Sequence, residues 1–252
     1  MNENISQVWN NPVDQPQLDE AQVHLWRASL DLPLILIEQL ASILTEDEIA
    51  KADKFHFPHH RRKFIAARGI LRQLLGQYLQ ISPKNIKFQY GDRGKPYLTR
   101  ATSGNSLEFN ISHSQDYALY GFTHSHAIGV DIEHLRTMED AAKIAQRFFS
   151  PQEFELVNCL SGEQQQRVFF KLWTAKEAYL KAVGIGLAGS LASIDISFDQ
   201  AEIPCLKSIQ GNAAETAPWS MYPCMPALGY VGAIAIKSKI APQQIKYWNW
   251  QL

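Results

Sequence analysis

Hydrophobic and polar residues alternate in several short stretches of the chain, and this pattern predicts strands. The first strand is expected at residues 23–30. Glycine, asparagine, aspartate and serine then separate further short strands, expected at 86–90, 97–98, 107–111, 117–122 and 128–133. In residues 128–133 the alternation places Ile128, Val130 and Ile132 on one face and Asp131 and Glu133 on the other.

Other segments carry apolar residues at helical spacing. One helical region begins near Thr45, which is followed by acidic residues, and runs to Leu79. It breaks at Phe57-Pro58, because proline disfavours helix in the residue before it. Helices are also expected at 140–149, 151–159 and 164–183, and strands at 194–198, 229–236 and 244–248. The order predicts an α+β fold.

Size and composition exclude several classes of protein. A length of 252 residues suits one large domain or two ordinary lobes, and we expect two. The 24 Lys and Arg balance 25 Asp and Glu, so the chain lacks the basic excess of a general nucleic-acid binder. Three widely spaced cysteines favour a reducing cytoplasm over a disulfide framework. No secretory signal or membrane span is expected, since the apolar run at 32–37 is shorter than the roughly 20 residues that a span needs.

Carboxylates on a predicted strand and a predicted helix are the candidate metal-binding and catalytic residues. Asp131 and Glu133 are two residues apart in the predicted strand, so their Cα atoms lie roughly 6.5 Å apart on one face and both side chains can reach one ion. Oxygen ligands suit Mg²⁺, which also takes phosphate oxygens. Glu177 offers a third ligand or a general base, and Lys181, one helical turn later, offers a cation for Glu177 or a phosphate.

Each of these features also has a plainer interpretation. An isolated Asp-x-Glu is common on the exposed face of a strand at a sheet edge. Glu177 and Lys181 also fit an i,i+4 surface ion pair that contributes only tenths of a kcal/mol. The basic residues before and within the helix after Pro58 fit a solvated face: Lys51, Lys54, Arg61, Arg62, Lys63, Arg68 and Arg72. The chemistry therefore depends on whether the strand and the helix meet.

Four motifs in order resemble those of the 4'-phosphopantetheinyl transferase superfamily, specifically its long Sfp-type branch. They are Gly94-Lys95-Pro96, Phe109-Asn110-Ile111-Ser112-His113-Ser114, Gly129-Val130-Asp131-Ile132-Glu133 and Trp173-Thr174-Ala175-Lys176-Glu177-Ala178-x-x-Lys181. The match spans about residues 45 to 187. The resemblance implies transfer of the 4'-phosphopantetheine arm of coenzyme A to a serine of an acyl or peptidyl carrier protein, with release of adenosine 3',5'-bisphosphate.

The resemblance also implies a fold: a pseudo-twofold monomer of two lobes, each a small, mostly antiparallel sheet packed with helices. We divide the chain into an N-terminal extension at 1–20, an N-terminal lobe at 21–126 and a C-terminal lobe at 127–252. The expected partners are coenzyme A and carrier proteins, with no nucleic acid and no membrane. Which carrier protein is modified stays open.

The resemblance assigns roles to individual residues. Asp131, Glu133 and Glu177 correspond to the acids that hold Mg²⁺, and Glu177 is also the candidate base. Lys181 would stabilise the developing charge. The candidate contacts to the nucleotide and its phosphates are Lys51, Arg62, Lys63, Lys95, Ser112 and His113. Glu48 departs from the pattern, because a relative in this branch has a lysine there that faces the nucleotide.

Two other functions would share part of this chemistry with the transferase. A Mg²⁺-dependent phosphodiesterase or nuclease would also use clustered carboxylates and a lysine, but the near-neutral charge and the ordered motifs oppose it. A catalytically silent module that binds coenzyme A or a carrier protein would have no need of all three acids.

Overall fold

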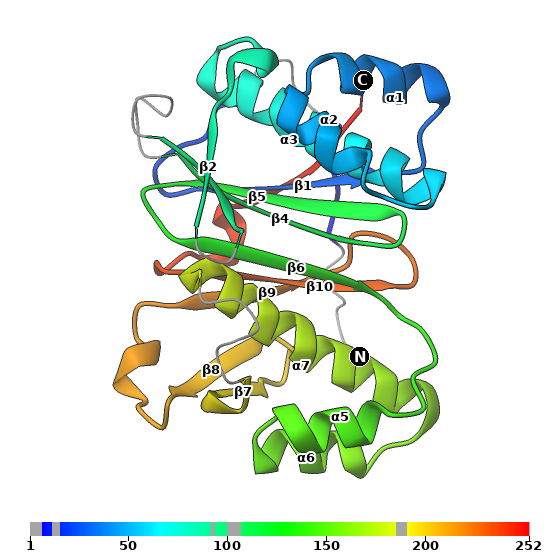
Figure 1. The fold of residues 1–252 in the computed structure, drawn as a ribbon. Coiled ribbons are helices and arrows are strands. Elements are labelled where there is room, and N and C mark those ends of the chain that lie inside the picture. Colours follow the sequence, from blue (N-terminus) through cyan, green and yellow to red (C-terminus); the bar gives the residue numbers. More distant parts are fainter. Residues whose placement is uncertain (1–6, 12–15, 92–93, 100–106, 185–190, 252) are drawn as a thin grey trace.

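The computed structural model describes residues 7–11, 16–91, 94–99, 107–184 and 191–251. It confirms the predicted α+β class. Two sheets lie next to one another in the middle of the molecule, and a group of helices covers the outer side of each (Figure 1). The order of layers is therefore helices, sheet, sheet, helices.

The first sheet has the strand order β11-β1-β5-β4. Its strands are β1 (Val23–Ser29), β4 (Leu107–Ser114), β5 (Tyr117–His124) and β11 (Ile245–Asn249). Strand β1 pairs antiparallel with β5 and parallel with β11. Three helices pack on its outer face, α1 (Leu34–Ser42), α2 (Glu46–Ala52) and α3 (Pro58–Leu79), and their core with the sheet includes Trp26, Leu40, Ile70 and Phe122.

The second sheet has the order β6-β10-β9. Its strands are β6 (Ile128–His134), β9 (Ser220–Cys224) and β10 (Tyr230–Ile236), all antiparallel. The helices α5 (Ala141–Phe148), α6 (Pro151–Asn158) and α7 (Gly162–Val183) lie on its outer side. Two separate hairpins complete the fold, β2 (Phe88–Tyr90) with β3 (Pro96–Leu98) and β7 (Ile194–Phe198) with β8 (Pro204–Ile209).

The two sheets share an apolar layer. It includes Leu25 and Leu119 from the first sheet and Val130 and Ile234 from the second. At Gly121 of β5 the sheets approach so closely that an added Cβ would lie 2.8 Å from Val130 Cγ1. The apolar side of β6 therefore faces the first sheet, as its alternation predicts, and Asp131 and Glu133 face the other way.

The predicted helices and strands are present with small differences in their ends, and the break at Phe57-Pro58 is confirmed. Helix α1 and strands β8 and β9 were not expected. Strand β11 belongs to the predicted C-terminal lobe by sequence, but it pairs with β1 of the first sheet. Asn10, in the predicted N-terminal extension, forms an isolated parallel bridge with Trp248 of that strand.

In the described part of the chain, no helix has both the length and the apolar character that crossing a membrane requires. The three cysteines, Cys159, Cys205 and Cys224, are all free thiols.

Candidate active site

Helix α7 lies directly on strand β6 because the strand has a glycine at the point of contact. An added Cβ at Gly129 would lie 1.9 Å from the carbonyl oxygen of Ala178, which leaves no room for any side chain. This contact brings the residues next to Ala178 on the helix toward the polar face of the strand. The strand and the helix therefore meet, and the carboxylates and the lysine share one site.

Lys181 and Asp131 form the centre of this site. Lys181 Nζ lies 2.6 Å from Asp131 Oδ1 and 2.7 Å from Ser112 Oγ, and Ser112 Oγ donates to the same Asp131 oxygen at 2.8 Å. Asp131 is 4% exposed, and Ser112 comes from β4 of the other sheet. The three side chains thus join both sheets and helix α7.

Strand β4 provides a row of polar side chains that runs along β6. Asn110 Oδ1 accepts the backbone N–H of Val130 at 2.9 Å, and Ser114 Oγ donates to Glu133 Oε2 at 2.9 Å. Glu133 also contacts Arg136 Nη1 at 3.3 Å. Asn110 and Ser114 were not predicted as site residues. The signal was present, since these two residues and Ser112 alternate with Ile111 along the strand and so share one face.

Glu177 is held in an environment that disfavours its charge. Its side chain is 8% exposed, and Oε1 has no hydrogen-bond partner among the described residues. Burial, followed by the charges of Asp131 and Glu133, raises the pKa of Glu177 to about 7, although Lys181 acts in the opposite direction. A carboxyl group with this pKa can accept or release a proton near neutral pH.

The donor set fits a hard divalent cation. Asp131 Oδ2 and Glu177 Oε1 are both buried without a hydrogen-bond partner among the described residues, which is costly unless a ligand completes them. No group of three His, Cys, Asp or Glu side chains in the described ranges is arranged to hold a metal ion by itself. Two carboxylates suit Mg²⁺ because it keeps several waters and takes phosphate oxygens as its remaining ligands.

Helix α7 is fixed by a buried ion pair on its other side. Lys176 is fully buried, and its Nζ lies 2.5 Å from Glu153 Oε2 and donates to the carbonyl oxygens of Leu191 and Ile194. Glu153 Oε1 accepts the backbone N–H of Ile196 at 2.7 Å. These bonds tie α6 and the start of β7 to the turn of α7 that carries Glu177.

Lys95 has a different neighbourhood from the one expected of a phosphate ligand. Its ammonium donates to the carbonyl oxygens of Lys181 at 2.6 Å and of Ile128 and Ala182 at 3.4 Å, so it caps the end of α7. Burial lowers the pKa of Lys95, and Glu108 raises it.

His113 is exposed and shares a face of β4 with Phe109 and Ile111, so it points away from the row of polar side chains that contacts β6.

The predicted cations of the basic segment lie on α2 and α3. Lys51 Nζ lies 4.1 Å from the centre of the Tyr90 ring, Lys63 pairs with Asp116 at 2.8 Å, and Arg62 is exposed. The structure thus places them on the helices that cover the first sheet, apart from the hydrogen bonds that join Asp131, Ser112 and Lys181.

Glu48, which departs from the family pattern, is buried against α3. It is 1% exposed, and its Oε2 lies 2.7 Å from Arg72 Nε while its Oε1 lies 3.4 Å from Arg68 Nε. The same carboxylate accepts the backbone N–H of Thr45 and so closes the start of α2. The acid is a structural ion-pair partner, because the two arginines of α3 surround it.

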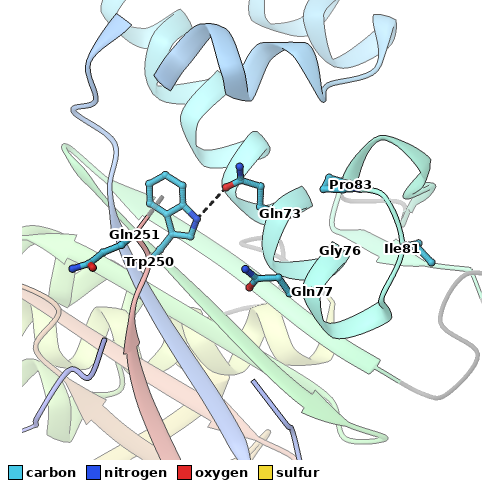
Figure 2. A pocket seen from close by; sticks show the side chains of 7 residues that line it. All are labelled: Gln73, Gly76, Gln77, Ile81, Pro83, Trp250 and Gln251. Atoms are coloured by element: carbon cyan, nitrogen blue, oxygen red, sulfur yellow. Dashed lines mark hydrogen bonds between the residues drawn. The ribbon is translucent and has the colours of Figure 1, made fainter. Parts of the chain in front are cut away.

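A shallow hollow elsewhere on the molecule has no such chemistry. It lies between α3 and the segment after β11, where Trp250 Nε1 donates to Gln73 Oε1 at 3.2 Å (Figure 2). Its lining residues are Gln73, Gly76, Gln77, Ile81, Pro83, Trp250 and Gln251. Since none of these side chains titrates or carries a charge, the candidate active site is the one around Asp131 and Glu177.

Known proteins share the sequence that builds this site. The sequence model of the 4'-phosphopantetheinyl transferase superfamily matches residues 127–225, and one described as 4'-phosphopantetheinyl transferase, N-terminal, matches residues 33–123. The 4'-phosphopantetheinyl transferase HetI of Nostoc sp. (strain PCC 7120) is 44% identical over 230 residues, which cover 91% of this chain and 92% of HetI. The 4'-phosphopantetheinyl transferase Sfp of Bacillus subtilis is 28% identical over 163 residues, 65% of this chain and 70% of Sfp.

A solved structure is also similar over part of the chain. It is a holo-(acyl-carrier-protein) synthase from Bacillus anthracis, in complex with CoA (3',5'-ADP), with 23% sequence identity and a TM-score of 0.36. The similarity covers 44% of this chain and 93% of that one.

Proposed function

The chain belongs to the 4'-phosphopantetheinyl transferase superfamily, and from this premise we propose that Asp131, Glu133, Glu177 and Lys181 form its catalytic centre. The enzyme transfers the 4'-phosphopantetheine arm of coenzyme A to a serine of a carrier protein and releases adenosine 3',5'-bisphosphate. The observation that carries the proposed site is the pair of buried, unpartnered oxygens on Asp131 and Glu177 beside Lys181.

Asp131 and Glu177 are the proposed ligands of Mg²⁺, and Glu133 would support them from the next polar position of β6. Their oxygens are the donors that this ion prefers, and Asp131 Oδ2 lacks any other partner among the described residues. The bound ion would neutralise the pyrophosphate of coenzyme A and so favour attack at phosphorus. Ser112 keeps Asp131 in place through its 2.8 Å hydrogen bond.

Glu177 is the proposed general base. Its pKa of about 7 leaves a substantial ionised fraction at neutral pH, and the carboxylate can then take the proton of the acceptor serine hydroxyl. The serine oxygen attacks the β-phosphorus of coenzyme A, and the bond from that phosphorus to the bisphosphate oxygen breaks. Lys181, held by Asp131 and Ser112, is placed to stabilise the negative charge that develops on the phosphate oxygens.

The nucleotide is proposed to extend from this centre toward α2 and α3. Lys51, Arg62 and Lys63 supply positive charge there, and the resemblance to the family places phosphate contacts at these positions. His113 lies exposed on the face of β4 that it shares with Phe109 and Ile111, the face toward α3. Lys95, whose ammonium caps α7, is proposed to position the helix end that carries Lys181 as well as to border the nucleotide.

We further propose a monomer of two lobes that divide near residue 126, with β11 crossing from the second lobe into the sheet of the first. The shared apolar layer between the sheets supports this arrangement, because it already buries the inner face of each. The cytoplasm is the proposed compartment, which the three free thiols support.

The test is the intact mass of an apo carrier protein after incubation with this enzyme, coenzyme A and Mg²⁺. The expected gain is about 340 Da, the mass of the transferred arm. The variant Asp131→Ala should fold with an unchanged circular dichroism spectrum and transfer no arm, whereas Asp19→Ala, a change at an exposed aspartate away from the site, should transfer at the wild-type rate. Transfer by Asp131→Ala at the wild-type rate would show that Asp131 is not a ligand.

A further inference from the structure

The connection between β9 and β10 carries an apolar side chain that is fully exposed among the described residues. Leu228 is 102% exposed, which means that it stands in solvent as fully as in an extended peptide, and Met225 is 51% exposed. The turn itself is ordered by a hydrogen bond from Tyr230 N to Ala227 O at 3.1 Å. A fully exposed leucine on a fixed turn buries no apolar surface and so contributes no hydrophobic stabilisation to the isolated protein.

This turn lies at the edge of the active site. In the antiparallel pair of β10 and β6, Val231 is opposite Glu133 and Tyr230 is opposite His134. The backbone N–H of Leu135 donates to Gly229 O at 2.8 Å, so the turn is bound to the end of β6. Leu228 is in the turn, three residues from Val231, so its Cα is at most about 10 Å from that of Val231, the residue opposite Glu133. Figure 1 shows the connection between β9 and β10 beside the end of β6.

The acceptor serine of the carrier protein has a short side chain. A serine hydroxyl oxygen is two bonds from its Cα, roughly 2.5 Å, so the backbone of the carrier protein must itself enter the site. A stable protein interface covers about 800 Å² on each partner, a patch with a radius of roughly 16 Å. An exposed side chain at most about 10 Å from Val231, the residue opposite Glu133, is therefore within the area that the carrier protein must cover.

We propose that Leu228, together with Met225 of the same connection, is a docking contact for the carrier protein, an inference that rests on the function proposed above. The partner surface that fits is an apolar depression next to the acceptor serine. It should have carboxylates at its edge, because Arg136, which follows β6 on the same rim, keeps 47% of its side chain exposed while it pairs with Glu133 at 3.3 Å. Burial of Leu228 would then favour the complex without any effect on coenzyme A.

The test compares Leu228→Ser and Leu228→Asp with Leu34→Ser, a change at another exposed leucine, which lies on α1. Steady-state transfer is measured by carrier mass at varied carrier and at varied coenzyme A. We expect Leu228→Ser to raise the KM for the carrier about tenfold, the change that corresponds to loss of one buried leucine contact, and Leu228→Asp to raise it further. The KM for coenzyme A, the kcat at saturating carrier and all constants of Leu34→Ser should stay at wild-type values.

The outcomes separate this inference from the proposed function. If the wild-type enzyme modifies the carrier but Leu228→Ser keeps the wild-type KM for it, the docking contact is refuted while the transferase stands. If sedimentation shows that Leu228→Ser turns a wild-type dimer into a monomer with the carrier KM unchanged, Leu228 binds a second copy of this chain, and the inference is again refuted. Because Leu228 is fully exposed among the described residues, a folding defect is not expected, and thermal unfolding of each variant checks this.

Discussion

Replacing Glu177 with glutamine should stabilise the enzyme in a pH-dependent way. Glutamine has nearly the shape of glutamate but cannot carry a negative charge beside Asp131 and Glu133. Folding raises the pKa of Glu177 from 4.5 to about 7, so the native protein binds this proton more tightly than the unfolded chain does. The stability associated with this group is therefore highest below about pH 4.5 and declines as the pH rises to about 7.

The size of the effect follows from the same values. A rise from 4.5 to about 7 corresponds to about 3.4 kcal/mol at 1.36 kcal/mol for each pKa unit. Solvent screening at the rim of the site reduces this, and we expect a net gain of about 2 kcal/mol for Glu177→Gln at pH 8. At pH 5 the two proteins should differ little, because the native carboxyl group is then protonated. For a chain of this length the gain corresponds to about 4–8 °C in Tm at pH 8.

The assay is urea unfolding of both proteins at pH 5, 6, 7, 8 and 9, with EDTA present so that no metal ion compensates the charge. Glu155→Gln is the matched control, since Glu155 is exposed on α6 and its change should give no pH-dependent difference. A gap between wild type and Glu177→Gln that stays constant from pH 5 to pH 9 would refute the reasoning. The stabilised variant should also lose transfer rate more than coenzyme A affinity, because the base is missing.

Two further predictions concern the packing that holds helix α7. Gly129→Ala should destabilise the protein by about 3 kcal/mol in urea unfolding, because the new Cβ would collide with Ala178 O, whereas Gly91→Ala, with its nearest neighbour 3.9 Å away, should cost little. Lys176→Met should cost about 3–5 kcal/mol by the same measurement, since it leaves Glu153 buried without its cation. Adding Glu153→Gln should restore part of that loss, and an equal loss in the single and double variants would contradict the ion-pair argument.

Much of the fold could be predicted where the signal is local. The alternation of β6 determines its orientation because one of its faces is buried between the sheets. The break before α3 follows from Pro58, whose effect is confined to its neighbours. Strand β9 was not predicted because it contains Pro223, and proline has no N–H to donate within a sheet. Since β9 lies at the edge of its sheet, the missing N–H of Pro223 is tolerated there.

The candidate site was predictable in its residue types and less so in its contacts. Asp131, Glu177 and Lys181 are brought together as the motifs indicated. The burial of Glu48 depends on Arg72, 24 positions away, and no local pattern reveals such a pairing. The role of Lys95 as a cap of α7 is equally a long-range contact, 86 positions from Lys181.

The pairing of β11 with β1 has a consequence for folding during synthesis on the ribosome. The ribosome makes β11 about 220 residues after β1. At about 5–20 residues per second, β1 waits on the order of 10–40 s with one edge unpaired. An open strand edge is a template for association with other chains. The first sheet therefore cannot be completed while most of the polypeptide is still being translated, and the speed of elongation sets how long each nascent chain needs protection from its neighbours.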